Sequence, residues 1–205
     1  HPNINPYSAE GNIMASAMGA LQKWGSIIQF AWTHNKDFFR SEMNPMFDMC
    51  SATQKLVHFP ACYAMFVRGD VSKGPADTVY VKESSFEKDI RTMANTQSAS
   101  AVNIEPSPLL AYLPLAMVSG EHIVEMPKLF ATEGKTPIRK EEDVPQRIKD
   151  AFAAKEVKSS TGELTWNWQE NGAGYFKVDT PNTKVFTGFV KGRSFEYKGM
   201  VLTPG

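Results

Sequence analysis

The residues best suited to chemistry in this chain are an aromatic ring and an imidazole that follow an apolar run. Trp32 and His34 come directly after residues 27–31, which are apolar except for Gln29. An indole offers a flat apolar face with one polar N–H group, which suits the C–H face of a sugar ring. His34 adds a group that can hydrogen-bond to hydroxyls. The pair indicates a carbohydrate-binding position, and the alternative is that Trp32 is a core residue at a strand end.

A second polar stretch opens the sequence. Residues 1–7 read His-Pro-Asn-Ile-Asn-Pro-Tyr, and a helix is predicted directly after them. Loops held by a rigid scaffold often carry binding residues. We therefore take His1 and Asn3 as candidate hydrogen-bonding residues for a substrate. The alternative is an ordinary connection that its prolines stiffen.

The carboxylates do not form a recognisable catalytic pair. Glycosidases use two carboxyl groups, roughly 5–5.5 Å apart in retaining enzymes and roughly 6.5–9.5 Å apart in inverting ones. Glu10 lies in the first turn of a predicted helix, where interaction with the helix dipole accounts for it. Asp37 and Glu42 follow the apolar run and are placed to contact a substrate. We therefore predict no catalytic residue within these 205 residues.

Composition excludes several other function classes. The 22 basic and 22 acidic residues give zero net charge, which argues against a nucleic-acid partner. The apolar runs fall well short of the roughly 20 residues that cross a bilayer, so no membrane partner is predicted. The histidines and cysteines lack metal-ligand spacing, so we predict no metal and no other cofactor. Cys50 and Cys62 are expected to be buried thiols, since a disulfide would need their Cα atoms within about 7 Å.

Hydrophobic spacing predicts the elements of the first third of the chain. Residues 8–24 carry apolar side chains at helical intervals, which predicts an amphipathic helix. Residues 27–32 are almost continuously apolar, as are strands of a parallel sheet or barrel that are covered on both faces. Residues 51–54 form a capping box that opens a second helix, and Pro60 is expected to kink it. A barrel strand at 27–32 would place Trp32 at its C-terminal end, where barrel enzymes have their active sites.

The rest of the sequence changes character. Short strands are predicted at 78–81 and 122–125, followed by a charge-rich surface connection with one short helix. From Gly162 the apolar period becomes two, which predicts an antiparallel run of strands to the end of the chain. Trp166 and Trp168 share one strand face in this run. They are either part of a sandwich core or a platform for a carbohydrate.

Seven short strings point to one enzyme group. They are residues 1–11, 19–24, 28–32, 47–49, 66–70, 162–166 and 178–183. The first five resemble the end of the catalytic barrel in large bacterial glycoside hydrolases of the clan A type. The last two resemble the C-terminal β-sandwich domain of the same group.

The resemblance implies a fold of the α/β plus all-β class. Residues 1–70 would be the last αβα portion of a (β/α)8 barrel, residues 71–160 a connecting region, and residues 161–205 an antiparallel β-sandwich portion. The expected chain is truncated at both ends. In this group the seventh strand carries a nucleophilic Glu, which would lie just before His1. Trp32 would match an aromatic residue of the sugar-binding subsite.

The resemblance also implies a function. The chain would be part of a glycoside hydrolase that cleaves O-glycosidic bonds in a poly- or oligosaccharide, with the carboxylate pair outside this chain, so the fragment alone would be inactive. Trp32 would stack on the sugar, and His1, Asn3 and His34 would hydrogen-bond to it. The remainder of the barrel, on the same or another chain, would be a second partner. Analogy favours an extracellular or periplasmic location.

Two alternatives stay open at this stage. A non-catalytic carbohydrate-binding or scaffold β domain would expose Trp166, Trp168, Tyr175 and Tyr197 in a flat row. An interaction module would instead dock its αβα segment into an incomplete barrel. That module would leave an apolar surface around residues 27–32 bare in the isolated chain.

Overall fold

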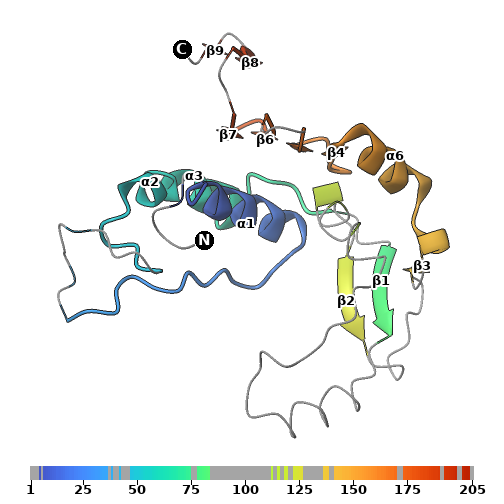
Figure 1. The fold of residues 1–205 in the computed structure, drawn as a ribbon, viewed down its shortest axis with the longest axis horizontal. Coiled ribbons are helices and arrows are strands. Elements are labelled where there is room, and N and C mark those ends of the chain that lie inside the picture. Colours follow the sequence, from blue (N-terminus) through green and yellow to red (C-terminus); the bar gives the residue numbers. More distant parts are fainter. Residues whose placement is uncertain are drawn as a thin grey trace, which may run out of the picture.

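The chain folds into a mixed arrangement of helices and β-sheets (Figure 1). The computed structural model describes residues 5, 7–36, 38, 42, 47–74, 78–83, 112, 115, 118–119, 122–126, 136–138, 141–169, 173–189, 192–197 and 200–203. The α-helices are α1 (Glu10–Leu21), α2 (Thr53–Leu56), α3 (Phe59–Phe66) and α6 (Gln146–Ala154), with a 3-10 turn η3 at Glu141–Asp143. The strands are β1 (Thr78–Glu83), β2 (His122–Met126), β3 (Thr136–Ile138), β4 (Glu156–Lys158), β5 (Leu164–Asn167), β6 (Tyr175–Asp179), β7 (Lys184–Gly188), β8 (Phe195–Tyr197) and β9 (Met200–Leu202). The predicted mixture of helices and antiparallel strands is confirmed.

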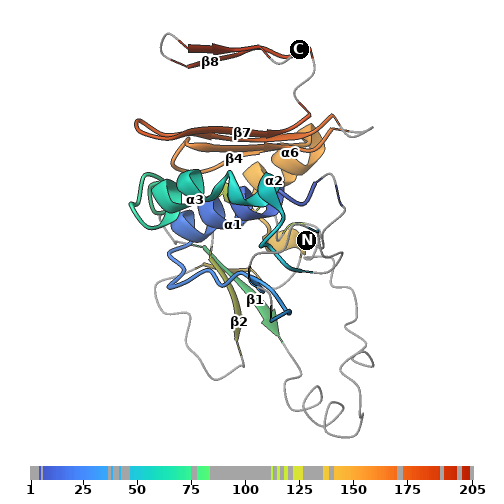
Figure 2. The same ribbon diagram turned by 90° about the vertical axis from the view of Figure 1, so that its left-hand side faces the viewer.

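Helix α1 forms where the apolar spacing predicts it. Ile13, Ala17 and Leu21 recur at helical intervals and are fully buried. The helix ends before Lys23, whose φ of 61° is in the left-handed region that stops a helix. On its buried side, a Cβ at Gly19 would lie 3.2 Å from the ring of Phe66 in α3. The two helices therefore pack side by side at close range (Figures 1 and 2).

Pro60 begins a helix rather than kinking one. In place of the single helix predicted after the capping box, the chain forms α2 and α3, separated at Val57 and His58. Pro60 lies in the first turn of α3, where its missing N–H deletes no helical hydrogen bond. The hydroxyl of Ser51 donates to the carbonyl oxygen of Glu42 at 2.8 Å instead of capping α2.

The predicted buried strand at residues 27–32 is wrong. The segment has no regular secondary structure, and its side chains include Ile28, 87% exposed, and Phe30, 63% exposed. The carbonyl oxygens of Ala31 and Trp32 accept hydrogen bonds from the backbone N–H of Met49, which belongs to a loop. A run of apolar residues becomes a buried strand only when neighbouring strands supply its hydrogen bonds and cover both faces. Within the described residues no strand pairs with it.

Strands β4, β5, β6 and β7 form an antiparallel sheet in chain order. The alternating pattern from Gly162 predicts β5, β6 and β7, whereas β4 lies in the stretch predicted as a surface connection. Leu164 in β5 lies opposite Val178 in β6, and both are fully buried. Phe176 is buried on the same face, opposite Trp166. Seen edge-on in Figure 2, this sheet lies over the layer that contains α1 and α3. Its apolar face therefore packs on the helices.

Two further sets of strands complete the described fold. Strand β1 pairs in parallel with both β2 and β3, in the order β2-β1-β3. The strands predicted at 78–81 and 122–125 are thus confirmed, whereas their parallel pairing was not predicted. Strands β8 and β9 form a separate antiparallel pair on the side of the four-stranded sheet away from the helices (Figure 2).

One hydrophobic core joins the helices to the four-stranded sheet. Its buried members come from the N-terminal, middle and C-terminal parts of the chain, among them Ile13, Ile148 and Leu164. The division at residues 70 and 160 stays a prediction. Cys62 lies in this core and burial raises the pKa of its thiol, while Cys50 is partly buried; both are free.

Polar contacts fix the junction between α3 and the sheet. The guanidinium of Arg68 donates to the carboxylate of Asp70, and the hydroxyl of Thr183 in the β6–β7 turn donates to the same carboxylate. These donors, Arg68 first, lower the pKa of Asp70 to about 2. The backbone N–H and the hydroxyl of Ser72 both donate to Glu163, at 2.6 and 2.8 Å. Thr183 and Glu163 both lie where β5 and β7 begin and β6 ends, so the loop after α3 is held to that one end of the sheet.

Candidate functional site

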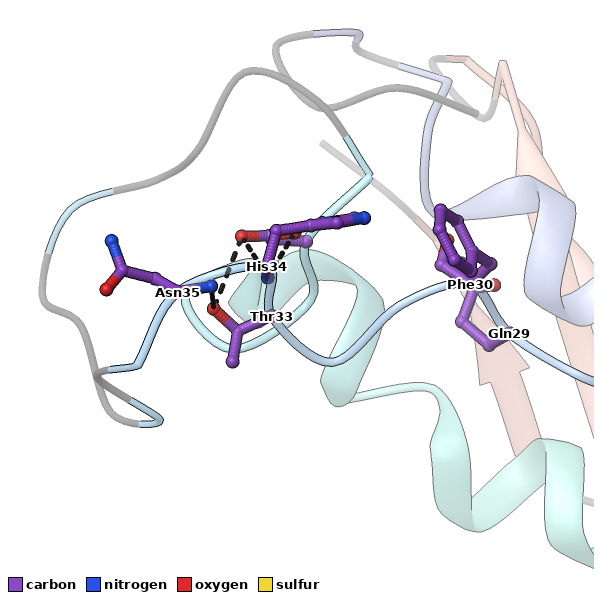
Figure 3. A network of polar contacts seen from close by, with 6 residues as sticks. Gln29, Phe30, Thr33, His34 and Asn35 are labelled. Atoms are coloured by element: carbon purple, nitrogen blue, oxygen red, sulfur yellow. Dashed lines mark hydrogen bonds and ion pairs between the residues drawn. The ribbon is translucent and has the colours of Figure 1, made fainter.

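Trp32 and His34 lie on an open loop that a buried carboxylate organises. Figure 3 shows the polar contacts around His34, with Thr33 and Asn35 beside it. Asp48 is fully buried and accepts hydrogen bonds from the backbone N–H of His34, at 3.2 Å, and from the hydroxyl of Thr33, at 3.3 Å. It also accepts from Nδ1 of the His34 ring. The hydrogen bond from the His34 side chain is the main cause that holds the pKa of Asp48 below its usual range. The carboxylate therefore fixes the ring and leaves Nε2 as the second ring nitrogen available to a ligand.

The two predicted side chains are accessible but do not sit at a strand end. The ring of Trp32 is 42% exposed, and its Nε1 donates to the carbonyl oxygen of Phe38 at 3.0 Å. The ring of Phe30 meets the His34 imidazole edge-on, with centroids 5.0 Å apart. His1 and Asn3, the other predicted site residues, lie outside the described residues, as does Asp37.

A pocket that the sequence did not predict lies between the start of α1 and one end of the four-stranded sheet. Its volume is about 240 Å³. The sheet contributes the end of β5, the beginning of β6 and the end of β7. The lining residues are Tyr7, Glu10 and Met14 from the α1 side, and Trp166, Asn167, Trp168, Gln169, Gly174, Tyr175, Phe176, Gly188 and Phe189 from the sheet side. Six of these are aromatic, so the wall is largely made of rings.

Strand register and two glycines bring these residues together. Tyr175 pairs with Gly188 across β6 and β7, and the backbone N–H of Phe189 donates to the carbonyl oxygen of Gly174 at 3.0 Å. A Cβ at Gly188 would lie 2.6 Å from that carbonyl oxygen, so only glycine permits the approach. The ring of Tyr7 then contacts that of Phe189, with centroids 5.8 Å apart. The N-terminal segment thereby closes over the end of β7.

The two indoles, predicted either as core or as a carbohydrate platform, pack on the core and also line the pocket. Trp166 and Trp168 are partly buried and pack against the hydrophobic core, and they also line the pocket. Their ring centroids are 5.0 Å apart and the rings are inclined by 42°. The geometry is that of a recessed wall rather than a flat exposed row. The side chain of Tyr197, the last member of the expected row, lies outside the described residues.

Three polar side chains accompany the rings. Asn167 is 6% exposed and donates from Nδ2 to Glu156 at 3.1 Å, while its Oδ1 is buried with no hydrogen-bond partner in the described structure. A buried unpaired carbonyl costs roughly 1–3 kcal/mol. Gln169 is exposed at the rim. Glu10 is partly buried, and desolvation raises its pKa.

Other site types find no support in the described part of the chain. Nowhere in it do three His, Cys, Asp or Glu side chains gather as a metal site requires. Nor does any helix described there have the length and apolar character needed to cross a membrane.

Comparison with protein-family models, curated proteins and solved structures finds no match to this chain. The geometry of the two sites is therefore the basis for a functional assignment.

Proposed function

We propose that this chain is the saccharide-binding part of a glycoside hydrolase, and that the pocket between α1 and the four-stranded sheet binds the sugar. The observation that carries the proposal is the set of aromatic residues that line one pocket together with the polar residues Glu10, Asn167 and Gln169. Aromatic faces pack on the C–H groups of a sugar ring, while amide and carboxylate oxygens accept from its hydroxyls.

The size of the pocket favours one sugar residue of a longer chain. Sites that enclose a whole small molecule usually measure roughly 300–1,000 Å³. At about 240 Å³, this pocket is smaller than that range. A terminal or branching residue would enter it, and the rest of the saccharide would lie in solvent.

The hydrolase component of the proposal rests on the resemblance noted in the sequence. It assigns residues 1–70 to the last part of a barrel and 161–205 to part of a sandwich, with the catalytic carboxylates outside this chain. The exposed side chains of Ile28 and Phe30 form an apolar surface that the remainder of the enzyme, on the same or another chain, would cover. Trp32 and the His34–Asp48 pair would then border the active site of the assembled enzyme.

The pocket is tested by removing one of its exposed rings. Phe189, 44% exposed, lines the pocket, whereas Phe152, 45% exposed, lies on α6 away from it. We expect Phe189→Ala to weaken saccharide binding at least tenfold, about 1.4 kcal/mol, because a ring that contacts the sugar is lost. Phe152→Ala should leave the affinity unchanged. Affinity electrophoresis in gels containing β-glucan, xylan, mannan or glucosamine polymers measures both.

Two results would contradict the pocket assignment. One is equal binding by the two variants. The other is failure of the unmodified chain to bind any saccharide in the panel.

A further inference from the structure

Glu10 is the one charged side chain among the described residues that line the pocket. Its carboxylate makes no hydrogen bond or ion pair with any described residue, while its backbone N–H donates to the carbonyl oxygen of Tyr7 at 3.2 Å. Glu10 is also partly buried, and this burial raises its pKa. Apart from the favourable interaction with the N-terminal end of α1, this carboxylate has no partner among the described residues, and a cation beside it would offset the cost of its partial desolvation.

The surrounding rings favour the same kind of ligand. The faces of tryptophan, tyrosine and phenylalanine carry a negative quadrupole that attracts a cation within about 6 Å of the ring centre. Trp166, Trp168 and Phe189 are among the aromatic residues that line the pocket. A neutral hydroxyl would satisfy hydrogen bonds but would not neutralise Glu10. Rings and carboxylate together are the chemistry that recognises an ammonium group.

We propose that the saccharide bound in this pocket carries a free ammonium group, as a polymer of amino sugars does, and that Glu10 pairs with this group while the rings enclose it. The inference rests on the proposed function, because it takes the ligand to be a saccharide. It adds the substrate class, a cationic sugar, and the residue that selects it.

No other acidic or basic side chain among the described lining residues neutralises the negative charge of Glu10. Tyr7 precedes Glu10, and Tyr175, whose pKa is raised mainly by burial, lines the pocket from β6. The lining segments of β5 and β7 bring no acidic or basic side chain. Arg193 packs over the ring of Tyr175, 5.0 Å from its centroid, and is not among the lining residues. Affinity for the amine should therefore fall as the pH drops through the raised pKa of Glu10, because protonation removes the one negative charge.

Calorimetric titration of the whole chain with three probes tests the inference. The probes are a β-1,4-linked glucosamine oligomer, its N-acetylated form of equal length, and tetramethylammonium. We expect the free amine to bind at least tenfold more tightly than the acetylated oligomer. Glu10→Gln should abolish that preference, and Glu196→Gln, a change at an exposed glutamate on β8, should preserve it.

The outcomes separate the inference from the proposed function. Equal affinity for the amine and its acetylated form, or a preference that survives Glu10→Gln, overturns the ammonium assignment and leaves saccharide binding intact. Binding of tetramethylammonium with no saccharide bound overturns both. The pH profile of the unmodified chain provides a check that needs no variant. Within the range in which the sugar amine is fully protonated, an affinity that does not fall as the pH drops through the raised pKa of Glu10 contradicts the role of Glu10.

Discussion

Replacing Gly188 by alanine should lower the free energy of unfolding by about 2 kcal/mol or more and remove saccharide binding. Gly188 has a φ of +117°, a conformation that costs a residue with a Cβ on the order of 1–3 kcal/mol. The new Cβ would also lie 2.6 Å from the carbonyl oxygen of Gly174 and 2.7 Å from the Cα of Tyr175. Because these atoms are backbone of the paired strand, β7 would have to move away from β6. Urea denaturation and the saccharide-binding assay measure the two effects.

Two control glycines separate steric contact from backbone strain. Gly192 has a φ of +72° but open space where a Cβ would be, so Gly192→Ala reports strain alone. Gly25 has neither feature, and Gly25→Ala should be nearly neutral. If Gly188→Ala were no worse than Gly192→Ala, the close approach of β7 to Gly174 would not be essential for the pocket wall.

Phe176→Ala should be the most destabilising of the side-chain substitutions considered. Phe176 is 2% exposed, belongs to the core between the sheet and the helices, and also lines the pocket. Truncating a buried phenylalanine costs about 3–5 kcal/mol through lost burial and the cavity that remains. Phe30→Ala is the matched control, because Phe30 is 63% exposed. We expect its effect to stay within about 0.5 kcal/mol in the same denaturation experiment.

The control also tests the description of residues 27–32. A loss for Phe30→Ala as large as that for Phe176→Ala would mean that the segment is buried after all. The sheet-and-helix core would then be an incomplete account of what stabilises the chain.

Local sequence patterns predicted those elements whose apolar face is buried by other parts of the same chain. The helical spacing of Ile13, Ala17 and Leu21 and the alternation around Phe176 gave α1 and the antiparallel strands, because each pattern directly states which face is buried. The prediction of a strand at residues 27–32 was wrong because its pattern lacks this information. An uninterrupted apolar run does not say which neighbours cover it, and no described strand does so.

The pocket could not be predicted because its parts meet only through tertiary structure. Glu10 is fully accounted for by the helix dipole when the sequence is viewed alone, and nothing local places it beside Trp166, which lies more than 150 positions later. Asp48, which orients His34, is likewise 14 residues distant. The glycines at 174 and 188 were the available signal, since an isolated glycine at a strand end often marks a close backbone approach.

The most direct test of the account uses the indole N–H resonances of the chain's four tryptophans, Trp24, Trp32, Trp166 and Trp168. Each resonance can be followed while the 15N-labelled chain is titrated with the β-1,4-linked glucosamine oligomer. Binding in the pocket predicts that the signals of Trp166 and Trp168 shift together along one saturation curve, while those of Trp24 and Trp32 stay in place. Movement of the Trp32 signal with Trp166 and Trp168 unchanged would place the sugar at the open loop and contradict the account.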